Sequence, residues 1–263
     1  MPEISVIIPT FNRPEMLKRA IASVEAQTFK DFELIVIDDA VLKKGGGGAR
    51  NEGIKKAQGK YIAFLDDDDT WMPNKLEVQH GLLNETSSDV GFSFTAVQNV
   101  FDDHEEITTI SEGIADYHKR VLENFKEFLN VTLMFKREVF DTVGGYDESF
   151  PNHQEGDLLI RATKRYKGLG INVPLTRVSM SKSYVRTNKA TPDMKIRGRE
   201  MLLQKHHDDF AADPENFAWQ LFFLAILYRD NKQANKAREL FKKAWNLDHK
   251  IRYKLHEFAT YLL

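Results

Sequence analysis

Four consecutive aspartates at residues 66–69 are the feature of this sequence most suited to chemistry. They directly follow an apolar run at residues 61–65, which has the composition of a buried strand. Carboxylates crowded at the end of a buried strand repel one another, and a divalent cation relieves that repulsion. Ligands that are all oxygen favour Mg²⁺ or Mn²⁺, ions that commonly bind between carboxylates and substrate phosphates. Taken without its context, such a run is also compatible with a solvated acidic turn.

Polar side chains follow two earlier predicted strands in the same way. The apolar run at residues 4–8 is followed by polar residues 10–13, and the run at 34–37 is followed by Asp38 and Asp39. A helix with apolar residues at helical spacing separates these two runs, so the order is that of a parallel β-α-β unit. Ligands of open α/β sheets bind at the carboxyl ends of the strands. We therefore expect all three polar groups at one edge of a sheet.

Three further segments permit two interpretations each. Asp38 and Asp39 either cap the next turn or accept hydrogen bonds from a base edge or a ribose hydroxyl. The glycines at 45–48 form either a flexible linker or, with Arg50 directly after them, a backbone that closely approaches a phosphate. Residues 155–161 have the pattern of an ordinary amphipathic helix with acidic residues in its first turn.

Composition restricts the class of protein. The chain has 263 residues, 42% hydrophobic and 29% charged, which excludes a mainly disordered protein. Its formal charge of −2 argues against a nucleic-acid partner. The absence of cysteine excludes disulfides, zinc–thiolate sites, iron–sulfur clusters and thiolate catalysis. The first residues do not have the pattern of a signal peptide, and the longest apolar stretch, at 221–228, is far below the ~20 residues that span a bilayer. We expect a cytoplasmic protein.

The rest of the chain divides by pattern and charge. Helices are expected at 49–58, 75–83, 138–143 and 157–166, and strands at 91–100 and 130–135. The last fifty residues have the spacing of a single helix pair of the tetratricopeptide type. Formal charge is −8 over residues 1–181 and +6 over 182–263. This basic tail is either a solvated helical surface or a peripheral contact with the inner face of an anionic membrane.

An ordered set of motifs resembles the inverting family-2 glycosyltransferases of the GT-A fold. The motifs are SVIIPTFNR at 5–13, IVIDD at 35–39, ARNEGI at 49–54, GKYIAFL at 59–65, DDDDTW at 66–71 and GGYDE at 144–148. Each is weak alone, but the set is specific and covers about residues 3–180. The resemblance implies an α/β, Rossmann-like and mostly parallel sheet flanked by helices. Residues 1–100 would bind the nucleotide-sugar, 101–190 would bind the acceptor, and 191–263 would form a C-terminal α-helical appendage.

The resemblance also implies roles for individual residues. Nucleotide-binding positions are Pro9, Thr10, Arg13, Asp39, Arg50 and Asp67, with Asp39 at the base and Asp67 at the ribose. Asp66 and Asp68 would bind the metal, Asp68 most directly. The family's general base is the Asp of a Glu-Asp pair before a Leu-x-x-Arg segment. Counting back from Arg161 places that pair at Gln154 and Glu155. The base is therefore expected to be Glu155, one methylene longer than the usual residue.

One segment departs from the family pattern. Between Asp39 and Gly45 the family has a further helix and strand, whereas this chain has only residues 40–44. Val41 and Leu42 are expected to be the end of that lost strand. Because the strand would lie at the edge of the sheet, its loss leaves the core intact and removes part of the nucleotide pocket's wall.

The sequence thus predicts a metal-dependent enzyme of the kind that builds bacterial surface polysaccharides. It would transfer a sugar, with inversion, from a nucleotide diphosphate donor, expected to be UDP-linked, to a hydroxyl of a glycan or lipid-linked acceptor. One alternative is a non-catalytic homologue that binds nucleotide-sugar or glycan, and another is a sugar-nucleotidyltransferase. The latter lacks support because its Gly-rich Lys/Arg signature is missing from the first loop. Donor hydrolysis with metal distinguishes the enzyme from a binder without turnover.

Overall fold

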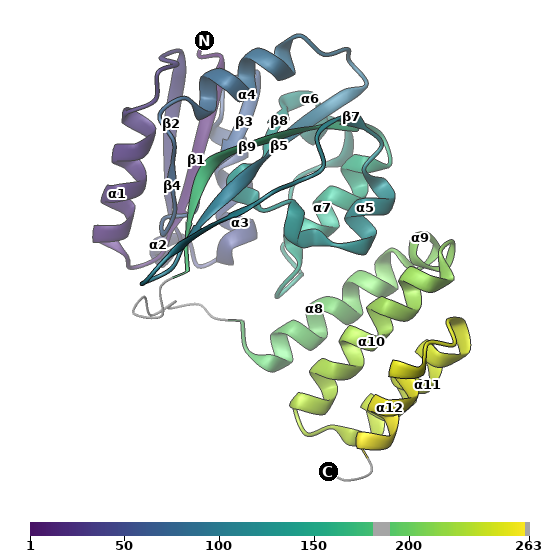
Figure 1. Cartoon of the computed structure of the whole chain (residues 1–263). Helices are drawn as coiled ribbons and strands as arrows, with labels where there is room; N and C mark the ends of the chain where they lie inside the picture. The colour runs from purple at the N-terminus through teal and green to yellow at the C-terminus, as the bar shows by residue number, and fades with distance from the viewer. Residues whose placement is uncertain (181–189, 261–263) are drawn as a thin grey trace. The chain divides into compact units, whose positions relative to one another are not determined.

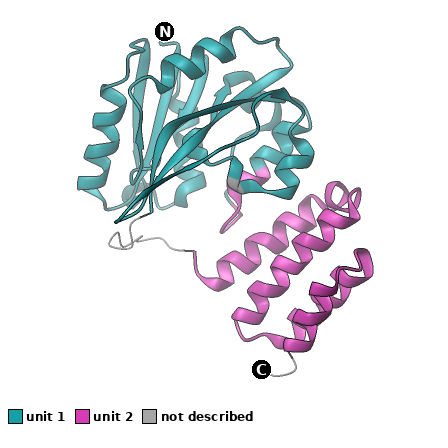
Figure 2. Ribbon diagram, in the orientation of Figure 1, with its two compact units in different colours: residues 1–148, 158–185 teal, residues 149–157, 186–263 magenta. Residues whose placement is uncertain are grey.

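The computed structural model describes residues 1–180 and 190–260 (Figure 1). It divides into two compact units (Figure 2). The sheet unit consists of Met1–Glu148 and Leu158–Val185, and the helical unit consists of Ser149–Asp157 and Arg186–Leu263. The helical unit therefore includes residues 149–157, which the sequence analysis assigns to the acceptor-binding half.

The sheet unit is built on a mixed, nine-stranded sheet. Its central order is β2-β1-β3-β8-β5-β9-β4, and β1 is parallel to both β2 and β3. The pair β5 and β9 is also parallel, whereas β8 is antiparallel to β3 and β5. The strands are β1 (Ile4–Thr10), β2 (Phe32–Asp38), β3 (Tyr61–Phe64), β4 (Thr70–Trp71), β5 (Val90–Val100), β6 (Glu105–Thr108), β7 (Gly113–Ala115), β8 (Met134–Lys136) and β9 (Lys167–Ser179).

Helices flank this sheet within the unit (Figure 1). They are α1 (Pro14–Glu25), α2 (Asp39–Leu42), α3 (Gly45–Lys56), α4 (Lys75–Asn84), α5 (His118–Glu123), α6 (Arg137–Val143) and α7 (Gln154–Thr163), with 3-10 turns η1 (Phe125–Glu127) and η2 (Asn130–Thr132). The division between the two units falls inside α7. Strands covered on both faces are apolar throughout. Accordingly, Ile4, Val6, Ile7 and Ile8 of β1 are all completely buried. The expected α/β fold with a helical C-terminal part is confirmed.

The structure corrects two local expectations, at residues 41–42 and 130–135, and decides against one of the two interpretations of residues 45–48. Val41 and Leu42 lie in the short helix α2 and are not the end of a strand, because the Asp38 carboxylate accepts the Ala40 N–H at 2.9 Å and starts a helical turn. The glycines at 45–48 are not a linker, since they form the first turn of α3. The strand expected at 130–135 is also shorter: it is preceded by η2 and begins only at Met134.

Helix α3 lies unusually close to β1. A Cβ built at Gly53 would lie 2.4 Å from the Ile7 Cγ2 atom, so only glycine permits this approach. The contact fixes α3 against the central strand. Arg50, one turn earlier on α3, is thereby mounted on the core of the sheet unit.

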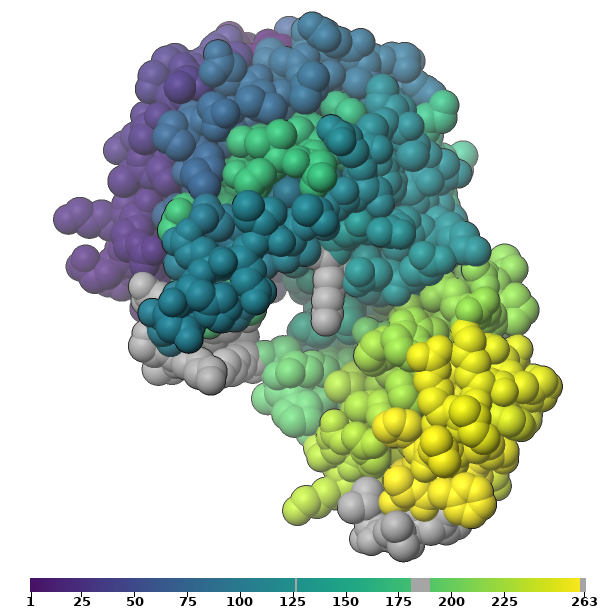
Figure 3. Space-filling model, in the orientation of Figure 1, coloured from purple at the N-terminus to yellow at the C-terminus, as the bar shows by residue number. Residues whose placement is uncertain are grey.

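The helical unit contains five helices among its described residues. They are α8 (Pro192–Lys205), α9 (His207–Ala211), α10 (Pro214–Asp230), α11 (Ala234–Leu247) and α12 (Ile251–Ala259). Helices α10 and α11 correspond to the expected pair, and the ring centres of Phe222 of α10 and Phe241 of α11 lie 5.6 Å apart. Figure 3 shows α11 and α12 at the surface of this unit, where Ile251 and Leu255 of α12 are 67% and 62% exposed. Within the described ranges, no helix has both the length and the apolar character needed to cross a membrane.

A buried lysine lies in the core of the sheet unit. The Lys75 ammonium donates to the Gln79 side chain and to the Thr132 carbonyl oxygen at 3.3 Å, and it lies 5.0 Å from the centre of the Trp71 ring. Burial lowers the pKa of Lys75 to about 7, because the charged ammonium loses its hydration. The unfolded chain, with an ordinary lysine pKa, binds the proton more tightly. The buried Lys75 therefore lowers the free energy of unfolding by its full amount below pH 7, and this cost declines as the pH rises from 7 towards 10.5.

We predict that Lys75→Met removes this pH dependence. Between pH 7 and pH 10 the parent becomes more stable as Lys75 loses its buried charge. The free energy of unfolding of the variant, measured relative to that of the parent, should therefore fall by about 3–4 kcal/mol. Hydrogen bonds lost to Gln79 and Thr132 affect the variant equally at each pH. Urea unfolding at pH 7, 8, 9 and 10 measures the difference. Lys60→Met, at a 72% exposed side chain, is the control, and equal pH slopes in parent and Lys75→Met would contradict the prediction.

Candidate active site

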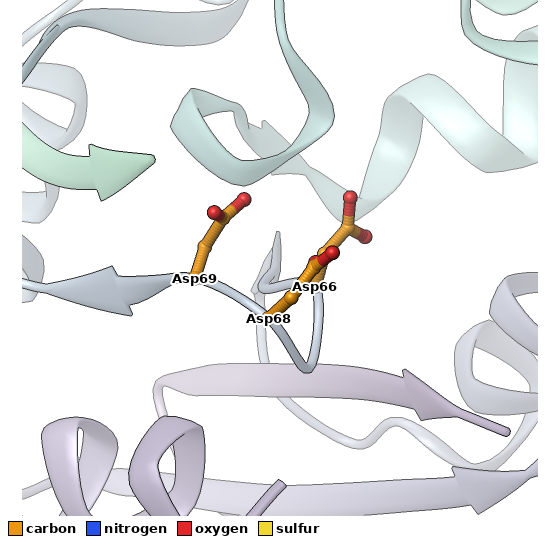
Figure 4. A group of neighbouring side chains, drawn as sticks. All are labelled: Asp66, Asp68 and Asp69. Carbon is orange, nitrogen blue, oxygen red and sulfur yellow. The ribbon is translucent and has the colours of Figure 1, made fainter. Parts of the chain in front are cut away.

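The four aspartates form the turn between β3 and β4. Figure 4 shows Asp66, Asp68 and Asp69 on this turn, and each offers one carboxylate oxygen within 4.8 Å of the others. The expected pair Asp66 and Asp68 is therefore joined by Asp69, which the sequence analysis missed. An alternating pattern treats 66–69 as extended chain, in which Asp69 faces away from Asp68. The Asp69 N–H instead donates to the Asp66 carbonyl oxygen at 3.2 Å, and this turn brings Asp69 back to Asp66.

Asp67, the fourth aspartate of this turn, is held by residues at the end of β1 and just before α1. Its carboxylate is buried and accepts the Thr10 hydroxyl at 2.8 Å and the Arg13 guanidinium at 2.8 Å. The same Arg13 nitrogen lies 3.2 Å from an oxygen of Asp68. Thr10 is the last residue of β1 and Arg13 precedes α1. The structure thus brings together the carboxyl ends of β1 and β3, as the sequence predicts.

A second arginine contacts the turn from another element. Arg50 of α3 donates to the Asp66 carboxylate at 2.5 Å, and its guanidinium carbon lies 5.8 Å from the centre of the Tyr146 ring. Guanidinium pairs of this kind are strong when they are partly shielded from water. The Arg50 side chain is 11% exposed and that of Asp66 is 36% exposed, so the pair is partly shielded from water.

Asp69 is held by a third part of the sheet. Its Oδ1 accepts the backbone N–H of Ser179, the last residue of β9, at 2.9 Å. The residue is buried. One oxygen of Asp69 therefore anchors the turn to β9, and the carboxylate as a whole remains within the group of three.

The charges of this site fit a divalent cation. Four carboxylates and the two guanidiniums of Arg13 and Arg50 leave two negative charges among these six groups. Burial raises the pKa of Asp68, and the neighbouring negative charge of Asp66 raises it further, although Arg13 acts in the opposite direction. A carboxylate in this condition is stabilised by a further positive charge. The donor set is oxygen only, which matches Mg²⁺ or Mn²⁺.

Two predicted nucleotide residues lie on neighbouring strand ends. Pro9 pairs with Ile37 across β1 and β2. Asp39 is buried at the start of α2, and its Oδ1 accepts the N–H groups of Lys44 at 2.8 Å and Gly45 at 3.1 Å. Asp39 therefore fixes the turn that leads into α3. Its contact with the nucleotide base stays a prediction.

The sequence motifs form one hydrogen-bond network within the sheet unit. The Asn51 carboxamide accepts the Tyr146 N–H and donates to the Tyr146 carbonyl oxygen, both at 2.8 Å. Arg161 of α7 donates to the carbonyl oxygens of Val143 and, at 2.7 Å, of Gly145. The segment at 144–148 thus connects α3 with α7, which explains why these separate motifs occur together.

Glu155 lies in the first turn of α7, within the helical unit, and is partly exposed. Asp157, two residues further on, is completely buried. Its carboxylate lies 2.9 Å from His206 Nε2 and 2.7 Å from Lys205 Nζ. Of these two acidic residues, Glu155 is consequently the one that solvent reaches. Asp157 makes its contacts inside the helical unit.

Comparison with known sequences identifies related proteins. The model of Glycosyl transferase family 2 matches residues 5–44 and 42–144. The amylovoran biosynthesis glycosyltransferase AmsB of Erwinia amylovora is 28% identical over 67% of this chain and 69% of its own length. An uncharacterized glycosyltransferase of Rickettsia conorii is 37% identical over 43% of this chain. That match covers only 22% of the Rickettsia protein, so this chain corresponds to less than a quarter of that relative.

Solved structures share the fold at low sequence identity. S. aureus TarS 1-349 in complex with UDP-GlcNAc matches 98% of this chain and 79% of its own, with a TM-score of 0.58 and 15% identity. The mannosyltransferase PcManGT of Pyrobaculum calidifontis, in complex with GDP-Man and Mn²⁺, matches 94% of this chain and 74% of its own, with a TM-score of 0.51 and 16% identity. These likenesses establish the GT-A fold.

The matched residues of the family model include the aspartate turn and both of its arginines. They also include Asn51 and Gly144, the first residue of the segment 144–148 that Asn51 contacts. Because this family model matches more than half of the residues of the chain, the protein belongs to glycosyl transferase family 2.

Proposed function

We propose that the protein transfers a sugar from a UDP-linked donor to a hydroxyl of a glycan or lipid-linked acceptor, with inversion at the anomeric carbon. The observation that carries this proposal is the group of Asp66, Asp68 and Asp69 at the carboxyl ends of parallel strands, where Arg50 contacts Asp66 and Arg13 contacts Asp68. Its excess negative charge suits a divalent cation, and such a cation suits a diphosphate. Strand ends of this type are where α/β proteins bind nucleotides.

The names of relatives support the choice of donor and acceptor. WfgD of Escherichia coli, 37% identical over 30% of this chain and 40% of its own length, is named for a UDP-Glc donor and a diphosphoundecaprenol-linked acceptor. A Campylobacter jejuni relative is named as a glucosyltransferase acting on a PP-undecaprenol acceptor. Together with the amylovoran enzyme, these names favour bacterial surface polysaccharide synthesis. Peripheral contact of the basic tail with the inner membrane face remains part of the proposal.

The proposed reaction is one in-line displacement. The acceptor oxygen forms a bond to the anomeric carbon while the bond from that carbon to the UDP phosphate oxygen breaks, and the configuration inverts. Glu155 takes the proton of the acceptor hydroxyl, which contributes ~10²–10⁴ in rate. A cation bound by Asp66, Asp68 and Asp69 supplies electrostatic stabilisation of the departing diphosphate. Thr10 and Arg13 hold Asp67 oriented at the nucleotide side of the turn.

A second candidate is a homologue that binds nucleotide-sugar or glycan without turnover. Glutamate in place of the family's aspartate at residue 155 and the short segment at 40–44 favour this alternative. The two candidates differ in one measurement. An enzyme releases UDP from its donor when Mn²⁺ is present, whereas a binder retains the intact donor.

We predict that Asp68→Asn keeps the fold and weakens UDP binding in Mn²⁺ by at least tenfold, because a neutral amide is a poor ligand for a hard cation. Asp69→Asn should weaken it as well. Isothermal titration of UDP, with Mn²⁺ and with EDTA, measures the effect. Asp141→Asn, at an exposed aspartate of α6, is the matched control. Equal UDP affinity in Mn²⁺ and in EDTA for the parent protein would contradict metal-dependent binding.

We predict that Glu155→Gln lowers sugar transfer by ~10²–10⁴, since the amide keeps the size of the side chain but accepts no proton. UDP affinity should change by less than about twofold, because the base faces the acceptor. Steady-state rates of UDP release, together with the Kd of UDP, test both statements. Asp157→Asn is unsuitable as a control, since Asp157 is buried in contact with Lys205 and His206. Glu215→Gln is the better control, because the Glu215 side chain, in the first turn of α10, is 73% exposed. Full activity of Glu155→Gln would remove this residue from the mechanism.

A further inference from the structure

Helix α8 contacts the segment that carries Glu155, within the helical unit. Gly198 and Lys205 are seven residues apart, as are Arg199 and His206 at the end of the helix, so these four residues share one face. Each contacts or faces a residue of the segment 150–157. We infer that this face of α8 positions the base: Lys205 and His206 hold Asp157, and through Asp157 they position Glu155. The inference rests on the proposed function, because Glu155 is the proposed base.

The first contact is a close approach of two backbones. A Cβ built at Gly198 would lie 2.7 Å from the Asn152 carbonyl oxygen and 2.9 Å from the Asn152 Cβ. A side chain at residue 198 would therefore push α8 away from the segment. Since glycine weakens a helix interior, its presence here is explained by the approach that it permits.

The second contact is the buried carboxylate of Asp157. It accepts a hydrogen bond from His206 Nε2 at 2.9 Å and pairs with Lys205 Nζ at 2.7 Å. The Lys205 ammonium also lies 5.3 Å from the centre of the Phe150 ring. Asp157 is completely buried, and His206 is 4% exposed. Removing one partner of a buried charged group leaves the other buried without compensation, which costs free energy. The positions of Asp157 and of its partners on α8 therefore depend strongly on one another.

The third observation is the backbone of His153. Its φ of +65° lies in the left-handed region, which non-glycine residues rarely occupy. Its carbonyl oxygen accepts the Asp157 N–H at 3.1 Å, which ties it to the first turn of α7. Burial and the nearby charge of Arg199 lower the pKa of His153 to about 4, so its imidazole is neutral at pH 7. Such a conformation persists only where the surroundings impose it.

These contacts bracket Glu155 on both sides. After it, Asp157 is held by Lys205 and His206; before it, Asn152 lies against Gly198 and the charge of Arg199 acts on His153. A general base must lie within ~3 Å of the proton that it accepts, and a displacement of ~1 Å costs about 10²-fold in rate. Loss of these α8 contacts should consequently lower the rate of the chemical step much more than the affinity for UDP, whose proposed ligands are all in the sheet unit.

The test compares two substitutions of one residue. His206→Gln keeps a nitrogen donor at the position of Nε2, whereas His206→Leu removes it. We expect His206→Leu and Lys205→Met each to lower kcat for UDP release at least tenfold, with the Kd of UDP within twofold of the parent. His206→Gln should recover most of the rate. The assay uses UDP-glucose, UDP-galactose and UDP-N-acetylglucosamine with Mn²⁺, and water as the acceptor. His207→Leu, at the adjacent exposed histidine, is the matched control and should retain the parent rate.

A double-mutant cycle separates positioning from general destabilisation. If His206 acts through Glu155, His206→Leu should cost less than twofold in a Glu155→Gln background. Equal losses in both backgrounds, an unchanged kcat, or a parallel loss of UDP affinity would overturn the inference. If the Leu variant does not fold, Lys205→Met, at a 37% exposed side chain, carries the same cycle. Failure of the proposed function is distinct, because then the parent itself releases no UDP or Glu155→Gln keeps the full rate.

Discussion

The four adjacent carboxylates at residues 66–69 need partners that balance their negative charge. The arrangement of the sheet unit at the carboxyl ends of its strands depends on this constraint. Like charges on one turn repel, and each must find a partner for the turn to persist. Arg13 and Thr10 compensate Asp67, Arg50 compensates Asp66, and the β9 backbone anchors Asp69. These partners come from the end of β1, from α3 and from the end of β9, so the turn draws three elements to one edge of the sheet. Burial, and after it the negative charge of Asp66, raise the pKa of Asp68, and carboxyl groups perturbed in this way are common at functional sites.

The same edge depends on contacts that carry no charge. Gly53 lets α3 lie against Ile7, and this contact places Arg50 near the aspartate turn. Asn51, next to Arg50, pairs with the backbone of Tyr146, and Arg161 holds the preceding glycine. Residues that are 95 positions apart thus hold one another in place. The motifs of this chain are therefore joined in one structural network, and a change in one of them should disturb the others.

The helical unit has a larger part in the proposed chemistry than an appendage would. Its helix α8 holds the turn that contains Glu155 through Gly198 and the Asp157–His206 contact. The substitution of glutamate for aspartate at the proposed base adds one methylene, and a longer side chain requires a correspondingly accurate backbone. The left-handed conformation of His153 indicates that such accuracy is imposed from outside the turn. The short connection after Asp39 is closed by α2, next to the edge strand β2.

The sequence by itself determined the parallel strands β1, β2 and β3 and the edge at which their polar residues meet. This was possible because an apolar run followed by polar residues is a local signal, and parallel strands end at the same edge. It also located Asp66 and Asp68, and the order of motifs indicated the family. Only the tertiary structure decided that Asp69 joins the group, that Asp67 is held by Thr10 and Arg13, and that Asp157 is buried against His206. These outcomes depend on the closure of one turn and on contacts between residues up to 57 positions apart, which no local pattern of residue types encodes.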